Sequence, residues 1–186
     1  MKKIFLAAGT ILAAATISFA QNNSDAKQVK MERTELRKEV RKEHRLENSN
    51  EVSDLTKSQF AIDFSNAKNV RFVKTKEFDE VVFLSGKKKL TAYYDYDNEL
   101  VGTTQEKTFA DLPANAQKEI LKKYADYNVD QVIKFDDNES NETDMIMYGT
   151  TFDDADNYFV ELKNSSKAII LEVDLSGGVS LFKDIK

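Results

Sequence analysis

The feature that most constrains the fold is an internal repeat. When the sequence is shifted by 79 residues, the segment FLSGKKKLTAYYDYDNELVGT superposes on LKNSSKAIILEVDLSGGVSLF, and Asp95 falls on Asp174. Each copy consists of β-type runs separated by turn residues, Ser85-Gly86-Lys87 and Asp97-Asn98 in one and Ser176-Gly177-Gly178 in the other. This pattern predicts two related units, at about 54–110 and 111–186.

A helix is predicted at the start of each unit. Residues 54–66 begin with Asp54 as the expected N-cap, and residues 111–124 carry Pro113 in the first turn, where a missing N–H costs nothing. The apolar positions expected to pack are Leu55, Phe60, Ile62 and Phe64 in the first helix and Leu112, Ala116, Ile120, Leu121 and Tyr124 in the second.

Four strand-like runs follow each helix. They are Val70–Lys76, Glu80–Leu84, Lys89–Tyr96 and Leu100–Glu106, then Val129–Phe135, Tyr158–Lys163, Ala168–Asp174 and Val179–Lys183. Because strands follow strands without helices between them, the sheet should be antiparallel. We expect an α+β fold in which two tandem helix-plus-meander units form one curved sheet with the helices on one face.

Alternation of side chains assigns the two faces of this sheet. The core face should carry Val81, Phe83, Leu90, Ala92 and Tyr94, and in the second unit Val160, Leu162, Ile169, Leu171 and Val173. The opposite face should carry Val82, Leu84, Thr91, Tyr93, Leu100, Phe159, Ile170, Val179 and Leu181. That is more apolar surface than a solvated sheet face normally shows. Either a register error or the N-terminal helix accounts for it, or the face binds another protein through Val82, Leu84, Tyr93, Leu100, Phe159, Ile170 and Leu181.

Residues 1–20 have the pattern of a secretory signal peptide. Lys2 and Lys3 precede an apolar, alanine-rich run, and a small-x-small site ends at Ala20. A membrane anchor is the alternative, but the run is shorter than the ~20 residues that a bilayer span needs. We expect a periplasmic or secreted protein after cleavage near Ala20.

Residues 21–53 form a charged leader and linker. The segment 27–47 lacks Gly and Pro and carries a basic row, Arg33, Arg37, Arg41 and Arg45, together with His44. It is predicted to be a solvated helix, or alternatively a basic face that contacts anionic envelope lipid or a partner, as in an envelope-associated accessory or stress protein.

The composition excludes several kinds of chemistry. The chain has no cysteine and one histidine, so disulfides, thiolate metal sites and multi-histidine sites cannot be built. Residues 48–186 hold 17 basic and 26 acidic residues, a net charge of −9, which argues against nucleic acid as a ligand. No nucleophile-elbow, zinc-protease, P-loop or dinucleotide motif occurs, so we expect no enzyme, no cofactor, no metal and no small-molecule ligand.

An acidic insertion interrupts the second unit at residues 136–157. It holds eight acids, Asp136, Asp137, Glu139, Glu142, Asp144, Asp153, Asp154 and Asp156, and no base. A solvated acidic loop is the simpler interpretation, and low-affinity calcium binding is a weaker alternative because its spacing lacks the glycine of a dedicated loop. Met145-Ile146-Met147-Tyr148 within it should dock on the body or form a short extra strand.

The strand-turn-strand LTAYYDYDNELVGTT, the helix LPANAQKEILKKY and the closing IILEVDLSGGVSLFK resemble the PepSY-like family of exported bacterial proteins. The resemblance covers roughly residues 54–186, and departs from the family in the turn at Asp97-Asn98-Glu99, which lacks glycine, and in the acidic insertion. It implies the fold of the β-lactamase inhibitor protein and a protein-binding or inhibitor-like role through the concave face of the sheet. No catalytic motif and no individual contact residue come with it.

Overall fold

One eight-stranded antiparallel sheet forms the body of the protein, with strand order β1-β2-β3-β4-β5-β8-β9-β10. The computed structural model describes residues 51–152 and 155–185, so the predicted signal peptide and most of the leader, with His44, lie outside the described residues. The elements are α2 (Asp54–Asp63), β1 (Lys68–Lys74), β2 (Asp79–Ser85), β3 (Lys88–Tyr94), β4 (Leu100–Lys107), η1 (Phe109–Asp111), α3 (Ala114–Lys123), β5 (Asn128–Asp137), β6 (Ile146–Met147), β7 (Thr150–Thr151), β8 (Asn157–Lys163), β9 (Ala168–Asp174) and β10 (Val179–Ile185).

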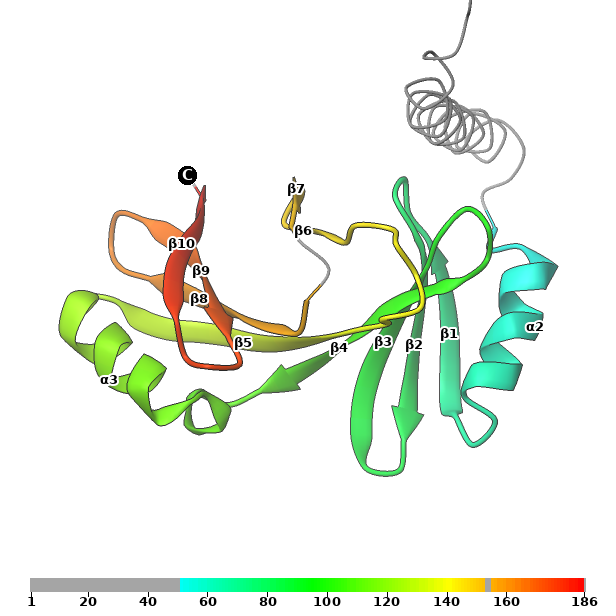
Figure 1. Ribbon diagram of the computed structural model, residues 1–186, viewed down its shortest axis with the longest axis horizontal. Coiled ribbons are helices and arrows are strands. Elements are labelled where there is room, and N and C mark those ends of the chain that lie inside the picture. The colour runs from blue at the N-terminus through cyan, green and yellow to red at the C-terminus, as the bar shows by residue number, and fades with distance from the viewer. Residues whose placement is uncertain (1–50, 153–154, 186) are drawn as a thin grey trace, which may run out of the picture. The chain divides into compact units, whose positions relative to one another are not determined.

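The element order is a helix and four strands, followed by a second helix and four strands (Figure 1). A separate two-stranded hairpin, β6–β7, interrupts the second set between β5 and β8. The sheet curves so that the strands at its two ends rise on either side of this hairpin (Figure 1). The expected α+β class with a large antiparallel sheet and two helices is confirmed.

The helices begin one step away from the expected caps. Ser53, not Asp54, caps α2, and its hydroxyl accepts a hydrogen bond from the backbone N–H of Thr56 at 3.0 Å. Pro113 is the N-cap of α3 and not a residue of its first turn, because residues 109–111 form a separate 3-10 turn before it. The backbone of Ser53 is extended, as an N-cap requires, and its short side chain therefore reaches an N–H group of the first turn that has no partner within the helix.

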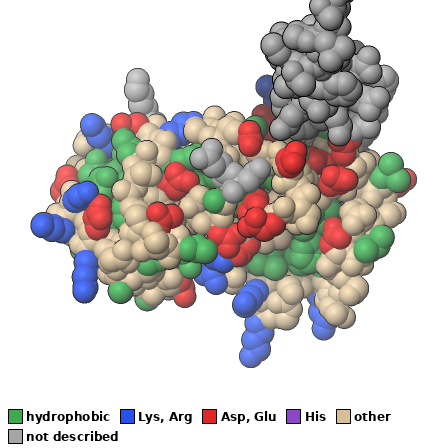
Figure 2. Space-filling model, viewed as in Figure 1, with side chains coloured by type: hydrophobic (Ala, Val, Ile, Leu, Met, Phe, Trp, Pro, Cys, Tyr) green, Lys and Arg blue, Asp and Glu red, His purple; other side chains and the backbone are tan. Residues whose placement is uncertain are grey.

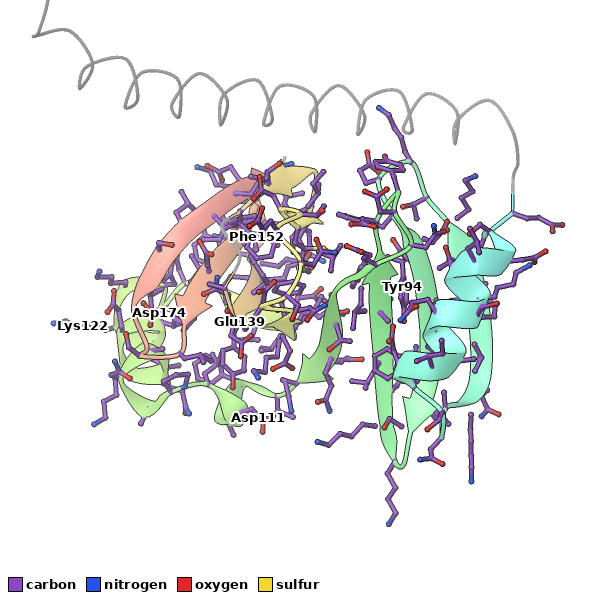
Figure 3. All side chains as sticks on the ribbon, turned by 45° about the vertical axis from the view of Figure 1, so that its right-hand side comes forward. Tyr94, Asp111, Lys122, Glu139, Phe152 and Asp174 are labelled. Carbon is purple, nitrogen blue, oxygen red and sulfur yellow. The ribbon has the colours of Figure 1, made fainter. Side chains whose placement is uncertain are left out.

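Both helices pack on the same face of the sheet. Phe60 of α2 covers Val81, Phe83, Ala92 and Tyr94, and Figure 3 shows Tyr94 beside that helix. Ala116 and Ile120 of α3, together with Leu112 just before the helix, pack on a second cluster, and this cluster contains Val132, Val160, Leu162, Ile169, Leu171 and Val173. The core face expected from alternation is therefore the helix-covered face.

Three apolar helix residues expected to pack are instead exposed. Leu55 and Ile62 of α2 keep 70% and 73% of their surface exposed, and Leu121 of α3 keeps 64%. Each helix is only ten residues long and contacts the sheet along a narrow stripe, so one large residue per turn suffices to fill it.

Two β-bulges change the side on which predicted residues lie. Between β3 and β4 the pairing passes from Tyr93–Gly102 to Tyr94–Leu100, so Val101 is the extra residue. Leu100 thereby packs on the helix side, against the α2 cluster, and its assignment to the opposite face is wrong.

The second bulge lies in the edge strand β10, between Leu181 and Lys183. Leu181 and Val179 pair with Leu171 and Val173 of the helix-side core, so both were assigned to the wrong face. Phe182, the extra residue, turns instead to the opposite face and packs against Phe159 with ring centroids 4.9 Å apart.

The opposite face of the second half is covered by the chain itself. The connection between β5 and β8 lies across it and contributes Met145, Met147 and Phe152 to a buried cluster with Phe78, Val101, Phe135, Phe159 and Ile170. Figure 3 shows Phe152 within this layer. Met145-Ile146-Met147-Tyr148 thus both docks on the body and forms a short strand, as expected.

Candidate protein-binding face

The two halves of the face opposite the helices differ in exposure. Phe159 and Ile170 are fully buried under the β5–β8 connection, so these two residues are not available to a partner. Val82, Leu84 and Tyr93 lie on this face in β2 and β3 and remain half-exposed, with Tyr93 packed against the edge of the covered cluster. The seven residues predicted from the sequence therefore do not form one surface, and three of them do.

We call the side chains of β1 to β4 on this side the open face. Strand pairing places Arg71 beside Val82, Val82 beside Thr91, and Thr91 beside Thr104. The full set is Lys68, Arg71, Val73, Glu80, Val82, Leu84, Lys89, Thr91, Tyr93, Thr104 and Glu106.

A groove of about 210 Å³ lies on the open face and its border with β5. Thr91 and Tyr93 of β3 and Thr104 of β4 form its centre, with Ile133 of β5 on the far side. The remaining lining side chains are Lys89, Glu106 and Gln131. Sequence reasoning did not indicate Thr104, Glu106 and Gln131, although the alternation rule places Thr104 and Glu106 on this face once the β4 bulge is known.

Tyr93 marks the boundary between the open and covered parts. Its hydroxyl lies 3.1 Å from Oγ1 of Thr104, and its ring contacts Phe78 edge-on at 6.0 Å between centroids. Burial raises the pKa of the Tyr93 hydroxyl, the Thr104 hydrogen bond opposes that shift, and the negative charge of Glu80 adds to it. The ring is therefore held in place by the body at one edge and presented to solvent at the other.

Charged side chains border the apolar strip. Lys68, Arg71 and Lys89 are exposed on the open face, and Lys87 and Lys88 continue the basic run through the β2–β3 turn. Burial raises the pKa of the Glu80 carboxyl, and the neighbouring Arg71 guanidinium partly reverses the shift. Figure 2 shows carboxylates gathered across the middle of the molecule and basic side chains toward its margins.

A second, larger cavity of about 550 Å³ lies on the helix side, between α2, the β3–β4 turn and the start of the β5–β8 connection. It is lined by Gln59, Asp63, Phe64, Glu99, Leu100, Asn138, Ser140 and Asn141. Asp63 is already engaged there, because it accepts hydrogen bonds from Tyr94 and Gln59 at 2.9 and 2.8 Å. Asn138 and Asn141 likewise donate hydrogen bonds to the carbonyl oxygen of Leu100, so the polar groups of this cavity largely stabilise the fold.

Asp95 and Asp174 occupy equivalent turns and have structural roles. Asp95 Oδ1 accepts from the N–H groups of Asp97 and Glu99 at 2.8 and 3.0 Å. Asp174 Oδ1 accepts from the Gly178 N–H at 2.9 Å and from the Ser176 hydroxyl at 2.6 Å, and these bonds lower its pKa. Each is an Asx-type turn residue, and the pair is not arranged around a common substrate position.

The acidic connection is held by the protein's own groups. Lys134 forms ion pairs with Asp136 and Asp156, and Asp156 Oδ1 also accepts from the Asp137 N–H at 2.8 Å. Within residues 51–152 and 155–185, no three His, Cys, Asp or Glu side chains are placed to share a metal ion. The described part of the chain thus offers no support for the calcium alternative.

Neither described helix has the length and apolar character needed to cross a bilayer.

Comparison with known proteins identifies the fold. No family model and no curated protein matches the sequence. A BLIP-like protein from Bacteroides fragilis superposes with a TM-score of 0.57 at 15% identity, over 74% of this chain and 89% of that one. A DUF2874 family protein from Bacteroides uniformis gives 0.58 at 10% identity, over 72% and 89%. A candidate periplasmic protein from Bacteroides eggerthii gives 0.58 at 12% identity, over the same shares. The expectation from the sequence is thereby confirmed at the level of architecture: this chain has the BLIP-like fold, that of β-lactamase-inhibitor-protein-like proteins.

Proposed function

We propose that this chain is an exported, non-enzymatic module that binds another protein through its open face. The observation that carries the proposal is the contrast between the two halves of one sheet face. The second half is sealed by Met145, Met147 and Phe152, whereas Val82 and Leu84 in the first half stay half-exposed beside a groove.

The shape and chemistry of the open face favour a protein over a small molecule. The groove holds only about 210 Å³, whereas small-molecule sites are usually clefts of about 300–1,000 Å³ that bury most of their ligand. Apolar side chains mixed with hydroxyls and charges are typical of the core and rim of a protein interface. The inhibitor-like neighbours in fold space support the same interpretation, because one of them is described as BLIP-like.

A non-enzymatic role is supported by what the open face contains. Its polar groups are threonines, a tyrosine hydrogen-bonded to Thr104, lysines and two separated glutamates. Such a set lacks the paired nucleophile and base on which covalent and acid–base catalysis depend.

The compartment is part of the proposal. The signal-peptide pattern that ends at Ala20 favours export, and a fold neighbour that is a candidate periplasmic protein is consistent with the periplasm. We place the mature protein there or outside the cell. We also propose that the two helix-plus-four-strand sets are tandem repeats, since the shift of 79 residues aligns Asp95 with Asp174 at equivalent turns.

Affinity capture from the envelope with three forms of the mature protein tests the binding role. Thr91→Arg fills the groove, and Leu121→Arg places the same charge on the outer side of α3. A partner that is retained by the wild type and by Leu121→Arg but lost with Thr91→Arg would support the open face. Retention by Thr91→Arg would exclude that face as the binding site.

The alternative role in the envelope depends on the basic row Arg33, Arg37, Arg41 and Arg45 of the leader. Deletion of residues 21–47 separates it from the main proposal. If association with the envelope is lost on deletion while capture through the open face persists, the leader acts as a second, independent contact.

A further inference from the structure

The covered half of the sheet shows what kind of segment fits this face. In the second helix-plus-four-strand set, residues 138–152 cross the face of β5, β8 and β9. In the first set the corresponding connection is only residues 75–78, a turn closed by the Thr75 N–H donating to Phe78 O at 2.9 Å. Among residues 51–152 and 155–185, the open face is therefore the position that lacks the cover present in the other half.

The cover, residues 138–152, combines two kinds of side chain. Met145, Met147 and Phe152 point into the sheet and are buried, while Glu139, Glu142 and Asp144 give the segment three negative charges and no positive one. Glu139, Glu142 and Asp144 are all exposed. Methionine and phenylalanine supply adaptable apolar contact, and the acids stay at the rim.

A basic group of the sheet meets this cover. Lys183, on the same face as Ile170, donates from its ammonium to the carbonyl oxygen of Tyr148 in the hairpin turn. The cover is thus held on the sheet by its buried apolar side chains, with Lys183 at its margin.

The open face offers matching features in the first half. Val82 and Leu84 form an apolar strip next to the groove, and exposed Lys68, Arg71 and Lys89 border it. Glu80 and Glu106 are its acids, so the face has one net positive charge within a body whose net charge is −9. With Lys87 and Lys88 at the adjoining turn, the local field attracts an anionic segment.

We propose that the partner presents an acidic loop or hairpin carrying methionine or aromatic side chains, which lies across β1 to β4 as residues 138–152 lie across β5, β8 and β9. This inference rests on the proposed function and specifies the partner's chemistry. A second copy of this chain is a poorer occupant, because its own residues Met145, Met147 and Phe152 are already buried in its body.

The direct test uses the chain's own cover as a probe. A peptide of residues 138–152, closed by a terminal disulfide, is titrated into the mature protein, and backbone amide shifts are recorded. One control peptide replaces Glu139, Glu142 and Asp144 by Gln and Asn, and another replaces Met145, Met147 and Phe152 by Ser. We expect shifts confined to β1–β4 and to Gln131 and Ile133 at the border with β5, and about tenfold weaker binding for either control peptide.

Protein variants provide the matched comparison. The double variant Lys68→Glu with Lys89→Glu should bind the peptide about tenfold more weakly, and its binding should lose most of the salt dependence. The double variant Lys118→Glu with Lys122→Glu, on α3, should bind the peptide as the wild type does. Equal binding of the uncharged peptide, shifts centred on β8–β10 or on the helices, or no binding at millimolar peptide would overturn the inference.

The outcome is separable from that of the proposed function. If a captured partner is lost with Thr91→Arg but is insensitive to salt and to the Lys68 and Lys89 reversals, the open face binds a protein of different chemistry. The binding role then stands and the acidic-loop inference fails. A dimer of the free protein in gel filtration that the peptide dissociates would instead indicate a second copy as the occupant, and would also contradict the inference.

Discussion

A β-carbon at Gly102 would lie 2.6 Å from Cε2 and Cζ of the Phe135 ring, and 2.7 Å from the backbone oxygen of Asp136. The fully buried ring thus lies directly against the backbone of β4, at the bulge where the open face meets the covered face. Glycine is required here by close approach, because a backbone neighbour cannot move away as a flexible side chain can.

Gly102→Ala should therefore destabilise the protein by about 1–3 kcal/mol, the usual cost of overpacking a core. Urea unfolding followed by circular dichroism measures the change. Gly86→Asn is the control, since Gly86 has a φ of +62° with open space around it and asparagine tolerates that conformation. Equal stability of Gly102→Ala and the wild type would show that Phe135 repacks freely.

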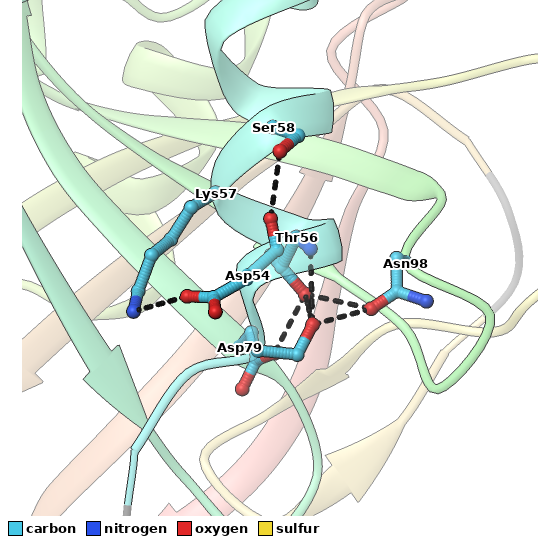
Figure 4. A network of polar contacts seen from close by, with 7 residues as sticks. Asp54, Thr56, Lys57, Ser58, Asp79 and Asn98 are labelled. Atoms are coloured by element: carbon cyan, nitrogen blue, oxygen red, sulfur yellow. Dashed lines mark hydrogen bonds and ion pairs between the residues drawn. The ribbon is translucent and has the colours of Figure 1, made fainter.

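The first turn of α2 is tied to the sheet through Thr56. Its hydroxyl is fully buried and donates to Asp79 Oδ2 at 2.8 Å (Figure 4). Thr56→Val keeps the shape and removes the donor, so we expect a loss of about 1.5–3 kcal/mol, the range for hydrogen bonds to charged groups. Ser58→Ala, an exposed hydroxyl bonded to the Asp54 carbonyl of its own helix, should change stability by less than about 0.5 kcal/mol.

Asp95 connects the β3–β4 turn to the cover. Besides the turn amides, its Oδ2 accepts from Asn141 Nδ2 and from the Thr143 hydroxyl, both at 3.1 Å. Asp95→Ala should lower the free energy of unfolding by more than about 3 kcal/mol, because four donors, in one buried and three part-buried hydrogen bonds, lose their acceptor together. Hydrogen exchange should also quicken in residues 138–143. Asp174→Ala, at the exposed equivalent turn, should cost clearly less, and an equal cost would contradict the role of the cover contacts.

Tyr148 has a buried hydroxyl with no hydrogen-bond partner among the described residues, and burial raises its pKa to about 12. Tyr148→Phe should keep the ring contact with Phe159 and raise stability by about 1 kcal/mol, because an unsatisfied hydroxyl is removed. Tyr94→Phe is the opposite case: it loses the 2.9 Å bond to Asp63 and should be destabilising. Thermal unfolding of both variants checks the contrast in sign.

The partly buried carboxyl of Glu80 should make the stability of the protein depend on pH. Burial raises its pKa from the ordinary value of 4.5, so the unfolded chain ionises first as pH rises, and ionisation costs stability in the folded state. The stability of Glu80→Gln relative to the wild type should therefore increase as pH rises above 4.5. The increase should level off once pH exceeds the raised pKa. Arg71→Gln should raise that pKa further, since the guanidinium opposes the shift. A stability difference that is flat from pH 4 to 8 would rule this out.

The sequence was informative wherever local pattern and fold agree. Alternation in Glu80–Leu84 and Lys89–Tyr96 placed Val81, Phe83, Ala92 and Tyr94 in the core, and all four are buried. It could not locate the bulges, because an extra residue such as Val101 or Phe182 leaves the apolar pattern readable in either register. The assignments of Leu100 and Leu181 failed for that reason.

The candidate protein-binding face likewise could be predicted only in part from the sequence. Val82, Leu84 and Tyr93 were identified from strand alternation alone, whereas the burial of Phe159 and Ile170 depends on another segment of the chain, residues 138–152, which includes Met145 and Met147. The apolar pattern of a strand reports that a face is covered or binds something. It carries no information on which segment supplies the cover.

By itself, the sequence determined the two helices, the antiparallel strands and the face that each helix covers, because helical and strand periodicities are local properties of the chain. The tertiary structure alone decided which part of the other face stays open. Hydrophobic contact is non-directional, so only the path of residues 138–152 determines that they seal β5, β8 and β9 and leave Val82, Leu84 and the groove uncovered.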